Sequence, residues 1–219
     1  MRLVGNHLVG ILGGTFNPIH CGHLRLAQEL AEALHLSEVR FIPSANPPHK
    51  AAPEVSAQRR AEMVGIAISD NSLFKLDARE LQRNSDSYTI DTLISLRETL
   101  GENAALCLIM GSDAFINLAT WHRWQELLNF CHIVLVQRPN KLPNQSALPK
   151  NLEALLHDNY TENIADLSQQ NAGFIHMQQI TALDISSTKI REMFKNGQTP
   201  RYLIPDKLIA YIKQHQLYK

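Results

Sequence analysis

Apolar and polar positions follow two distinct patterns along the chain, and together these patterns predict strands and helices in turn. Six segments have the short apolar runs that are typical of strands: residues 8–12, 39–42, 74–77, 105–110, 132–136 and 174–177. Apolar residues recur at helical spacing in segments 24–34, 56–70, 89–100 and 121–129, from about residue 186, and after Pro205. This alternation predicts an α/β fold with a parallel sheet and helices on both faces.

Two stretches follow neither pattern. Residues 43–53 contain four prolines, which exclude regular structure and predict an exposed connection of a kind that often binds ligands. Residues 138–172 are polar, and only 152–157 is periodic. Because the chain of 219 residues has no repeat and no long linker, we expect a single domain, 1–219, with a C-terminal helical part (about 186–219) packed on the sheet.

Charge and cysteine content narrow the class of protein. Lys and Arg equal Asp and Glu at 21 each, so no overall positive field attracts a nucleic acid, and any phosphate site has to be local. The three cysteines are far apart and odd in number, which disfavours a disulfide framework and suits a reducing compartment. No apolar run approaches the roughly 18 residues of a membrane-spanning helix. We therefore expect a cytoplasmic protein that binds neither nucleic acid nor membrane.

The first predicted strand and the first predicted helix are joined by the sequence GGTFNPIHCGH, residues 13–23. Ligands of open parallel sheets bind beyond the carboxyl ends of the strands, and a helix N-terminus favours phosphate. Glycines let a phosphate approach closely, and His20 and His23, three residues apart, can direct donors at one anion. Zinc ligands or plain turn residues are the alternatives, but a zinc site needs further ligands at matching places. The pattern is neither G-x-G-x-x-G nor a P-loop, which disfavours both hydride transfer and P-loop phosphoryl transfer.

A second polar motif, ISSTKIR, occupies residues 185–191. Ser186 or Ser187 can cap a helix there, and the first helical amides, the hydroxyls and Arg191 can together form an anion pocket. Alone, this motif is typical of an ordinary capped surface helix. Combined with residues 13–23, it predicts one triphosphate held between two helix starts.

Both motifs resemble the signatures of the nucleotidyltransferase superfamily, H-x-G-H near the N-terminus and I-S-S-T-x-I-R near the C-terminus. The resemblance implies a Rossmann-like, open and mostly parallel sheet of the nucleotidyltransferase type. Within that superfamily, the chain is similar over nearly its whole length to the bacterial nicotinate mononucleotide adenylyltransferases. It departs from them slightly at Asn17, where many relatives have Asp, and has Cys21 at a variable position of the motif.

Further segments carry this narrower resemblance. PSANPPHK (43–50) is similar to the family's proline loop, whose His and Lys meet phosphates, and SYTIDT (87–92) to the helix start beside the pyridine ring. MGSD (110–113) resembles a G-x-D element whose acid meets a ribose. On its own, the proline segment is equally typical of a solvated loop. Thr89 alone is a good helix N-cap, and Asp113 alone is compatible with a helix cap.

An indole carries the remaining resemblance. Trp121 and His122 resemble the family's Trp and following residue, where the indole stacks on the nicotinate and the next backbone amide touches its carboxylate. A core tryptophan at a helix start is the competing interpretation of Trp121, and it is the default for Trp124. Arg138 follows the fifth predicted strand, where it would add charge near ATP.

The resemblance assigns roles to individual residues. Those expected to act in catalysis are His20, His23, Lys50 and Arg191. Those expected to bind ATP are Gly13, Gly14, Thr15, Phe16, Gly22, Gly111, Asp113, Arg138, Ile185, Ser186, Ser187 and Thr188. Those expected to bind the mononucleotide are Asn46, His49, Thr89, Ile90, Trp121 and His122.

The reaction implied is in-line attack by a mononucleotide phosphate oxygen on the α-phosphorus of ATP, with release of pyrophosphate. Mg²⁺ would be held mainly by phosphates, so no protein metal ligands are expected. The substrates would be ATP and nicotinate mononucleotide, and self-association into a homo-oligomer stays open. The alternatives are nicotinamide mononucleotide or phosphopantetheine as acceptor, a cytidylyltransferase, or a nucleotide sensor without turnover.

Overall fold

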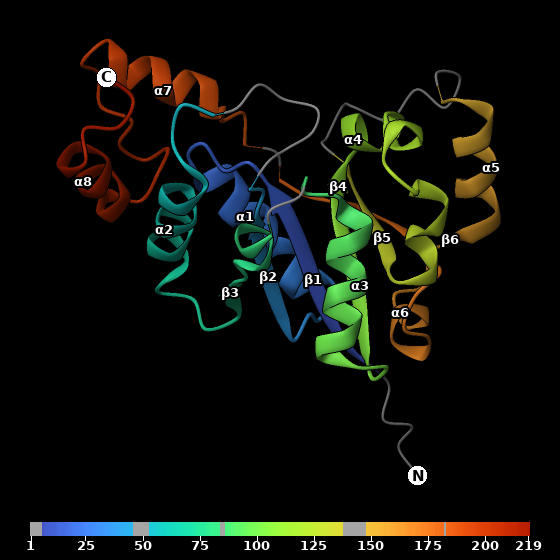
Figure 1. Cartoon of the computed structure of the whole chain (residues 1–219). Helices are drawn as coiled ribbons and strands as arrows, with labels where there is room; N and C mark the ends of the chain where they lie inside the picture. The colour runs from blue at the N-terminus through green and yellow to red at the C-terminus, as the bar shows by residue number, and fades with distance from the viewer. Residues whose placement is uncertain (1–5, 46–52, 84–85, 138–147, 182) are drawn as a thin grey trace. The chain divides into compact units, whose positions relative to one another are not determined.

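The computed structural model describes residues 6–45, 53–83, 86–137, 148–181 and 183–219 (Figure 1). Its strands are β1 (His7–Gly14), β2 (Glu38–Pro43), β3 (Phe74–Leu76), β4 (Ala104–Gly111), β5 (His132–Gln137), β6 (Tyr160–Thr161) and β7 (Ile175–Gln179). They form one open seven-stranded sheet in the order β3-β2-β1-β4-β5-β7-β6. The pairs β1–β4, β4–β5, β5–β7 and β6–β7 are parallel, so the predicted parallel α/β fold is confirmed.

Eight α-helices lie among the described residues: α1 (Cys21–Ala33), α2 (Ala57–Ile68), α3 (Thr89–Leu100), α4 (Ser112–Ile116), α5 (Lys150–Asn159), α6 (Asp166–Gln169), α7 (Ser187–Lys195) and α8 (Asp206–Gln214). Short 3₁₀ helices occupy Arg79–Gln82, Leu118–Thr120 and Trp124–Asn129. None of the described helices is long and apolar enough to cross a membrane.

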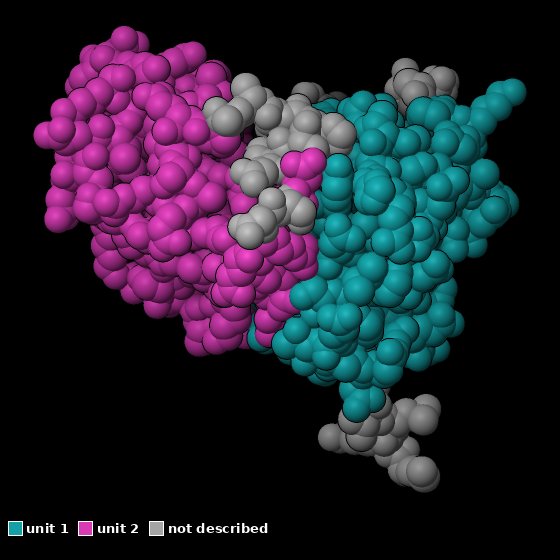
Figure 2. Space-filling model, viewed as in Figure 1, with its two compact units in different colours: residues 1–12, 29–39, 88–181 teal, residues 13–28, 40–87, 182–219 magenta. Residues whose placement is uncertain are grey.

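The residues fall into two compact units (Figure 2). Unit 1 contains residues 1–12, 29–39 and 88–181, and unit 2 contains residues 13–28, 40–87 and 182–219. The organisation of the whole chain as one domain stays a prediction.

Unit 1 is built on β4 and β5, whose side chains are buried on both faces of the sheet. Seven of the eight residues of β4, and five of the six residues of β5, are buried. This is why both strands have continuous apolar sequences rather than alternating ones. The helix α3 packs on β4 through Ile90, Leu93 and Leu96, which recur at helical spacing on its inner face.

In unit 2, α2 packs against β3 and α8 (Figure 1). Ser56 caps α2, because its side chain accepts the N–H of Arg59. The buried residues of α8 are Leu208, Ile209 and Ile212, as the apolar spacing predicts. The strand β1 enters this unit at its carboxyl end, Gly13–Gly14, and leads into the turn that precedes α1.

Two local predictions were wrong. The helix predicted for residues 121–129 begins only at Trp124 and is a 3₁₀ helix, because Arg123 has a left-handed backbone (φ 50°) that interrupts the helix there. Thr89 is not the N-cap of α3. Tyr88 occupies that position without a side-chain cap, and Thr89 is the first helical residue.

Candidate functional site

The turn between β1 and α1 lies in unit 2 and combines open and buried positions. Gly13 is exposed, and a Cβ added there would meet no atom within 4 Å, so a ligand can approach its backbone. Phe16 folds inward with a positive φ of 47° and is 3% exposed, and its ring makes a T-shaped contact with the His23 ring. The turn is therefore anchored by an apolar ring while its glycine backbone faces open space.

His20 and His23 are stacked on each other at the end of this turn. Their ring centroids are 3.7 Å apart with an interplanar angle of 28°. The backbone N–H of His20 donates to Nδ1 of His23 at 3.3 Å. Since Nδ1 accepts that hydrogen bond, the proton of a neutral His23 ring is on Nε2. The two predicted imidazoles are thus brought together, and Nε2 of His23 is a hydrogen-bond donor.

Both imidazoles are held in the neutral form. Burial lowers the pKa of His20 to about 4. Burial, and then the neighbouring His20, lower the pKa of His23 to about 3. Nδ1 of His20 is buried and has no hydrogen-bond partner among the described residues. At neutral pH the two rings are therefore uncharged, and they interact with an anion through hydrogen bonds rather than through a positive charge.

Gly22 is required by the histidine stack itself. A Cβ at this position would lie 3.0 Å from Nδ1 of His20 and 3.7 Å from Cβ of Ile185. The first distance is too short for an ordinary contact, so a side chain would displace the His20 ring. The glycine of H-x-G-H is therefore explained in this chain by close approach rather than by backbone freedom.

The second motif, residues 185–191, is brought onto the same turn within unit 2. The Ser187 hydroxyl donates to the carbonyl of Pro18 at 2.9 Å, and the Arg191 guanidinium donates to the carbonyl of Asn17 at 2.8 Å. A second bond of 3.3 Å joins Arg191 to the hydroxyl of Thr188. Two motifs that are some 160 residues apart in sequence thus form one cluster, which we call the phosphate cluster: residues 13–23 and 185–191.

The starts of the two helices in this cluster differ. At α1 the N–H of Cys21 is already bonded to the carbonyl of Leu203 at 2.8 Å. Ser186 occupies the N-cap position of α7 without a side-chain bond, and helix geometry leaves the amides of Ser187 and Thr188 without intrahelical acceptors. Ser186 therefore does not cap the helix through its hydroxyl. Of the two helix starts, α7 has the more open amides for an anion.

Two side chains outside the predicted site hold this turn. Arg60 of α2 is 1% exposed and donates to the Thr15 carbonyl at 2.6 Å, while Tyr218 is 2% exposed and donates to Oδ1 of Asn17 at 2.6 Å. Arg60 shares the inner face of α2 with Met63 and Val64. In the sequence, its role could have been suspected only from an arginine that falls among the apolar positions of this helix. No sequence pattern pairs Tyr218 with Asn17.

A second cluster lies in unit 1, where the start of α3 meets the turn after the 3₁₀ helix Leu118–Thr120. The rings of Tyr88 and His122 are 4.5 Å apart at 35°, and Arg123 lies 3.9 Å from the carboxylate of Asp91. Residues 88–92 and 121–123 are therefore neighbours within unit 1, and we call them the α3 cluster. Trp121 is half-buried and His122 is exposed, so Trp121 is not a core residue. Trp124 is also only half-buried.

The first amides of α3 have a geometry that suits a carboxylate. No side chain caps this helix, and the N–H groups of Thr89 and Ile90 precede the first intrahelical bond, from Thr92 to Tyr88. Gly111 and Asp113 belong to unit 1 as well. Gly111 ends β4 and is exposed, and Asp113 lies in the first turn of the short helix α4 rather than at its cap.

Four predicted site residues, Asn46, His49, Lys50 and Arg138, lie outside the described residues. Among the described residues, no group of three or more His, Cys, Asp or Glu side chains is placed to hold a metal ion. The cluster in unit 2 consists instead of imidazoles, hydroxyls, amides and a guanidinium. Groups of these kinds can bind phosphate oxygens.

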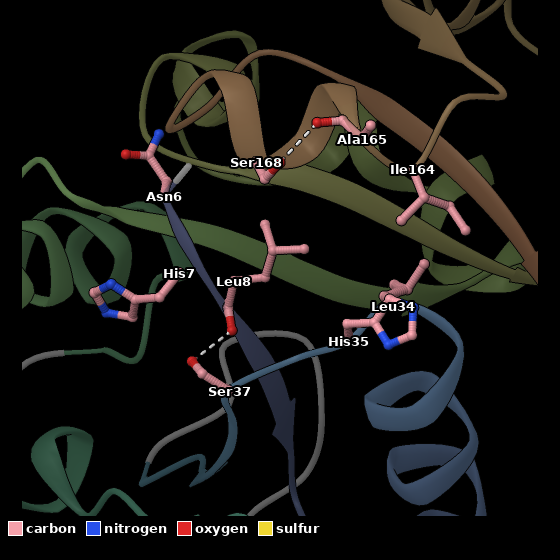
Figure 3. A pocket seen from close by; sticks show the side chains of 9 residues that line it. All are labelled: Asn6, His7, Leu8, Leu34, His35, Ser37, Ile164, Ala165 and Ser168. Atoms are coloured by element: carbon pink, nitrogen blue, oxygen red, sulfur yellow. Dashed lines mark hydrogen bonds between the residues drawn. The ribbon is translucent and has the colours of Figure 1, made fainter. Parts of the chain in front are cut away.

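A cavity of about 430 Å³ occupies a different place, at the amino end of β1 in unit 1 (Figure 3). Its lining residues are Asn6, His7, Leu8, Leu34, His35, Ser37, Ile164, Ala165 and Ser168. The Ser37 and Ser168 hydroxyls donate to backbone carbonyls within this lining. None of these residues belongs to either cluster, so the cavity is not part of the candidate site.

Comparison with known proteins agrees with both motifs. The model of the cytidylyltransferase-like family matches residues 11–193. A Pseudomonas putida (strain GB-1) protein named "Probable nicotinate-nucleotide adenylyltransferase" is 45% identical over 96% of this chain and 94% of its own length. An Aeromonas hydrophila protein of the same name is 43% identical over 96% and 97%. The chain belongs to the nicotinate-nucleotide adenylyltransferase family.

A solved structure shares the fold of this nicotinate-nucleotide adenylyltransferase family member. The Plasmodium falciparum nicotinic acid mononucleotide adenylyltransferase complexed with NaAD superposes with a TM-score of 0.71. The likeness covers 97% of each chain at 19% identity, and so it concerns the fold alone. The family model and the two relatives confirm, at the level of the family, the resemblance drawn from H-x-G-H and I-S-S-T-x-I-R.

Proposed function

We propose that this chain transfers the adenylyl group of ATP to nicotinate mononucleotide, forming nicotinate adenine dinucleotide and pyrophosphate in NAD biosynthesis. The observation that carries the proposal is the phosphate cluster. The stacked, neutral His20–His23 pair shares one turn with Ser187 and Arg191, and chains with 42–45% identity carry the corresponding enzyme name.

The phosphate cluster is the proposed ATP end of the site. Gly13, Gly14, Thr15 and Phe16 provide the backbone against which phosphates lie, and Gly22 keeps His20 in place. Nε2 of His23 donates a hydrogen bond to a phosphate oxygen, and the open amides at the start of α7 bind the outer phosphates together with Arg191. Ile185, Ser186, Ser187 and Thr188 complete this cluster. Arg138, Gly111 and Asp113 are assigned to ATP binding by the family resemblance.

The α3 cluster is the proposed pyridine end. The amides of Thr89 and Ile90 and the amide of His122 would receive the nicotinate carboxylate, while the half-buried Trp121 indole would stack on the ring. A helix N-terminus favours a carboxylate over a neutral amide, which supports nicotinate as the preferred acceptor. Asn46, His49 and Lys50 are assigned to the mononucleotide and its phosphate by the family resemblance.

The chemistry needs no protein nucleophile. A phosphate oxygen of the mononucleotide forms a bond to the α-phosphorus of ATP, and the bond from that phosphorus to the bridging oxygen breaks. The electron pair leaves with pyrophosphate. His20, His23, Lys50 and Arg191 stabilise charge on the oxygens of the transition state, and fixed donors in a partly buried turn do so without reorganising. Mg²⁺, when bound with ATP, would neutralise phosphate charge.

The cellular compartment and the binding partners belong to this proposal as well. Cys21, Cys107 and Cys131 are all free thiols, which suits a reducing cytoplasm. The proposed partners are the small molecules ATP and nicotinate mononucleotide.

The direct test is pyrophosphate release by the purified protein with Mg²⁺ and ATP. The acceptors compared are nicotinate mononucleotide, nicotinamide mononucleotide and phosphopantetheine. We expect strong release with the nicotinate acceptor and release at least about 100-fold weaker with the amide, because only the carboxylate gains from the α3 amides. Equal rates with the amide would contradict the carboxylate site. Release with phosphopantetheine alone would contradict the assigned acceptor, and no release with any acceptor would favour a nucleotide sensor.

A further inference from the structure

Arg60 forms hydrogen bonds that connect three segments of unit 2. It donates from Nη1 to the Thr15 carbonyl at 2.6 Å and from Nη2 to the Ser44 carbonyl at 2.7 Å. Longer bonds of 3.2 Å reach Ala45 from Nη2 and Val55 from Nε. Among the described residues it forms no salt bridge, so this buried guanidinium is bound entirely by backbone carbonyls.

These acceptors flank the residues that carry the proposed chemistry. Thr15 belongs to the turn that leads to His20. Ser44 and Ala45 directly precede residues 46–52, the part of the proline loop that contains Asn46, His49 and Lys50, and Val55 follows it. The N–H of Ser44 also donates to the Gly14 carbonyl at 2.9 Å, so the end of β2 and the phosphate turn are joined at adjacent residues.

A guanidinium suits this place better than any other side chain. Its planar fork presents five donors in fixed directions, whereas an ammonium has three donors on a single atom. Burial lowers the pKa of Arg60, but an arginine remains charged throughout the neutral range. One rigid group therefore joins three loop ends just beyond the point where the paired strands β1 and β2 end.

We propose that Arg60 is a positioning residue for adenylyl transfer: it holds the Thr15 turn and both flanks of the 46–52 segment at the separation the reaction requires. This inference rests on the proposed function. In the proposed reaction, Arg60 contacts no substrate. The residue acts through the backbone of the groups that do.

Arg97 provides a matched control in unit 1. Its guanidinium also donates to four backbone carbonyls, those of Gly101, Ala104, Phe130 and Asn171, at 2.5–3.0 Å. Ala104 begins β4, so these bonds lie at the opposite end of that strand from Gly111. Arg60 and Arg97 thus make the same kind of bond in the same number, but none of the acceptors of Arg97 belongs to a proposed site residue.

The kinetic test compares R60K with R97K at a temperature at which both variants are fully folded. Each should lower the melting temperature, because each loses two or more bonds to buried carbonyls. We expect R60K to lower kcat/KM for pyrophosphate release by about 10- to 100-fold, and R97K by less than about 3-fold. Equal kinetic losses in the two variants, or no loss in R60K, would overturn the proposal, because a merely structural role lowers melting temperature without that contrast.

Hydrogen exchange of backbone amides supplies a readout that needs no activity. In R60K the amides of Ser44 and His20 should exchange about 10-fold faster or more, while amides around Ala104 do not change. R97K should show the reverse. Unchanged exchange at Ser44 in R60K would overturn the proposal. If the wild type released no pyrophosphate while R60K still loosened Ser44, the proposed reaction would fail and the positioning role on the turn would stand.

Should R60K not fold, NMR of the wild-type guanidinium decides. Four carbonyl bonds should slow rotation about the Cζ–Nε bond of Arg60 and give separate Nη proton signals. These signals should shift when pyrophosphate is added, because the Thr15 carbonyl is part of the turn that binds it. Rapidly rotating or unshifted Nη protons would overturn the proposal.

Discussion

The turn that carries His20 and the turn that carries Trp121 are held in place by different means. In unit 2, Phe16, Ile19 and His20 are at most 7% exposed, and the carbonyls of the turn accept bonds from other elements. In unit 1, His122 and Arg123 are exposed. Besides local backbone hydrogen bonds, that turn has the contact between the Tyr88 and His122 rings and the ion pairs of Arg123 with Glu126 and Asp91.

The difference matches the work proposed for each turn. Exposed ion pairs contribute little to stability, so the Trp121 turn can adjust when a ring enters. Hydrogen bonds from buried donors to backbone carbonyls are costly to break, so the histidine turn keeps its geometry. Charge stabilisation in a transition state gains most from donors that are already fixed. Recognition of a flat ring tolerates adjustment.

The largest effect on activity should come from a mutation in the turn that carries His20 and His23. We expect His23→Ala to lower kcat about 1,000-fold, because it removes a fixed Nε2 donor to phosphate. Circular dichroism and the melting curve should show a folded protein, since the contact of Phe16 with Phe41 and the burial of Ile19 remain. His7→Ala, at the other end of β1, is the control and should retain normal kcat. A near-normal rate for His23→Ala would remove the histidine pair from catalysis.

The second effect is on stability against acid. The folded-state pKa of His23, about 3, lies below the unfolded value of about 6.5, so the unfolded chain binds the proton first as pH falls. The stability contributed by the neutral ring is therefore complete above pH 6.5 and is lost progressively between that pH and 3. Urea unfolding at pH 7.5 and 5 should show a loss of about 2 kcal/mol from this group. His23→Asn should remove that part of the loss, and an unchanged pH dependence in the variant would contradict the depressed pKa.

The smallest effect on activity should come from a mutation in the turn that carries Trp121. We expect Trp121→Ala to raise KM for the mononucleotide about 10-fold with little change in KM for ATP, because only stacking on the pyridine ring is lost. Trp124→Ala is the matched control, as both indoles are half-buried. Similar kinetics for the two variants would show that Trp121 has no specific role, and the contrast between the two turns would then lose its functional meaning.

The strands of the sheet and its motifs were predictable because their signals are local. Continuous apolar runs predicted β1, β4 and β5, and the histidine motif fell, as expected, where β1 ends. The two-residue strand β6 and the five-residue helix α4 are too short to show the apolar spacing that is typical of a strand or a helix. The helix expected from residue 121 failed for a related reason, since the left-handed Arg123 is a single residue inside an otherwise helical pattern.

The side chains that hold the histidine turn in place, Tyr218 and Arg60, could not be predicted in the same way. Tyr218 bonds to a residue 201 positions away, and nothing in the local sequence around 218 indicates that distance. Arg60 interrupts an apolar stripe, but a cation there is equally compatible with a side chain that reaches solvent. Its four acceptors are backbone carbonyls, which have no sequence signature at all.

The close approach at Gly22 also determines how this motif can vary over time. A Cβ at position 22 would lie 3.0 Å from the His20 ring, so we expect most substitutions there to disturb the histidine pair. The neighbouring position 21 contributes its backbone N–H to Leu203, which every residue except proline can supply. A library that randomises both positions should therefore return glycine at 22 and a broad set of residues, without proline, at 21.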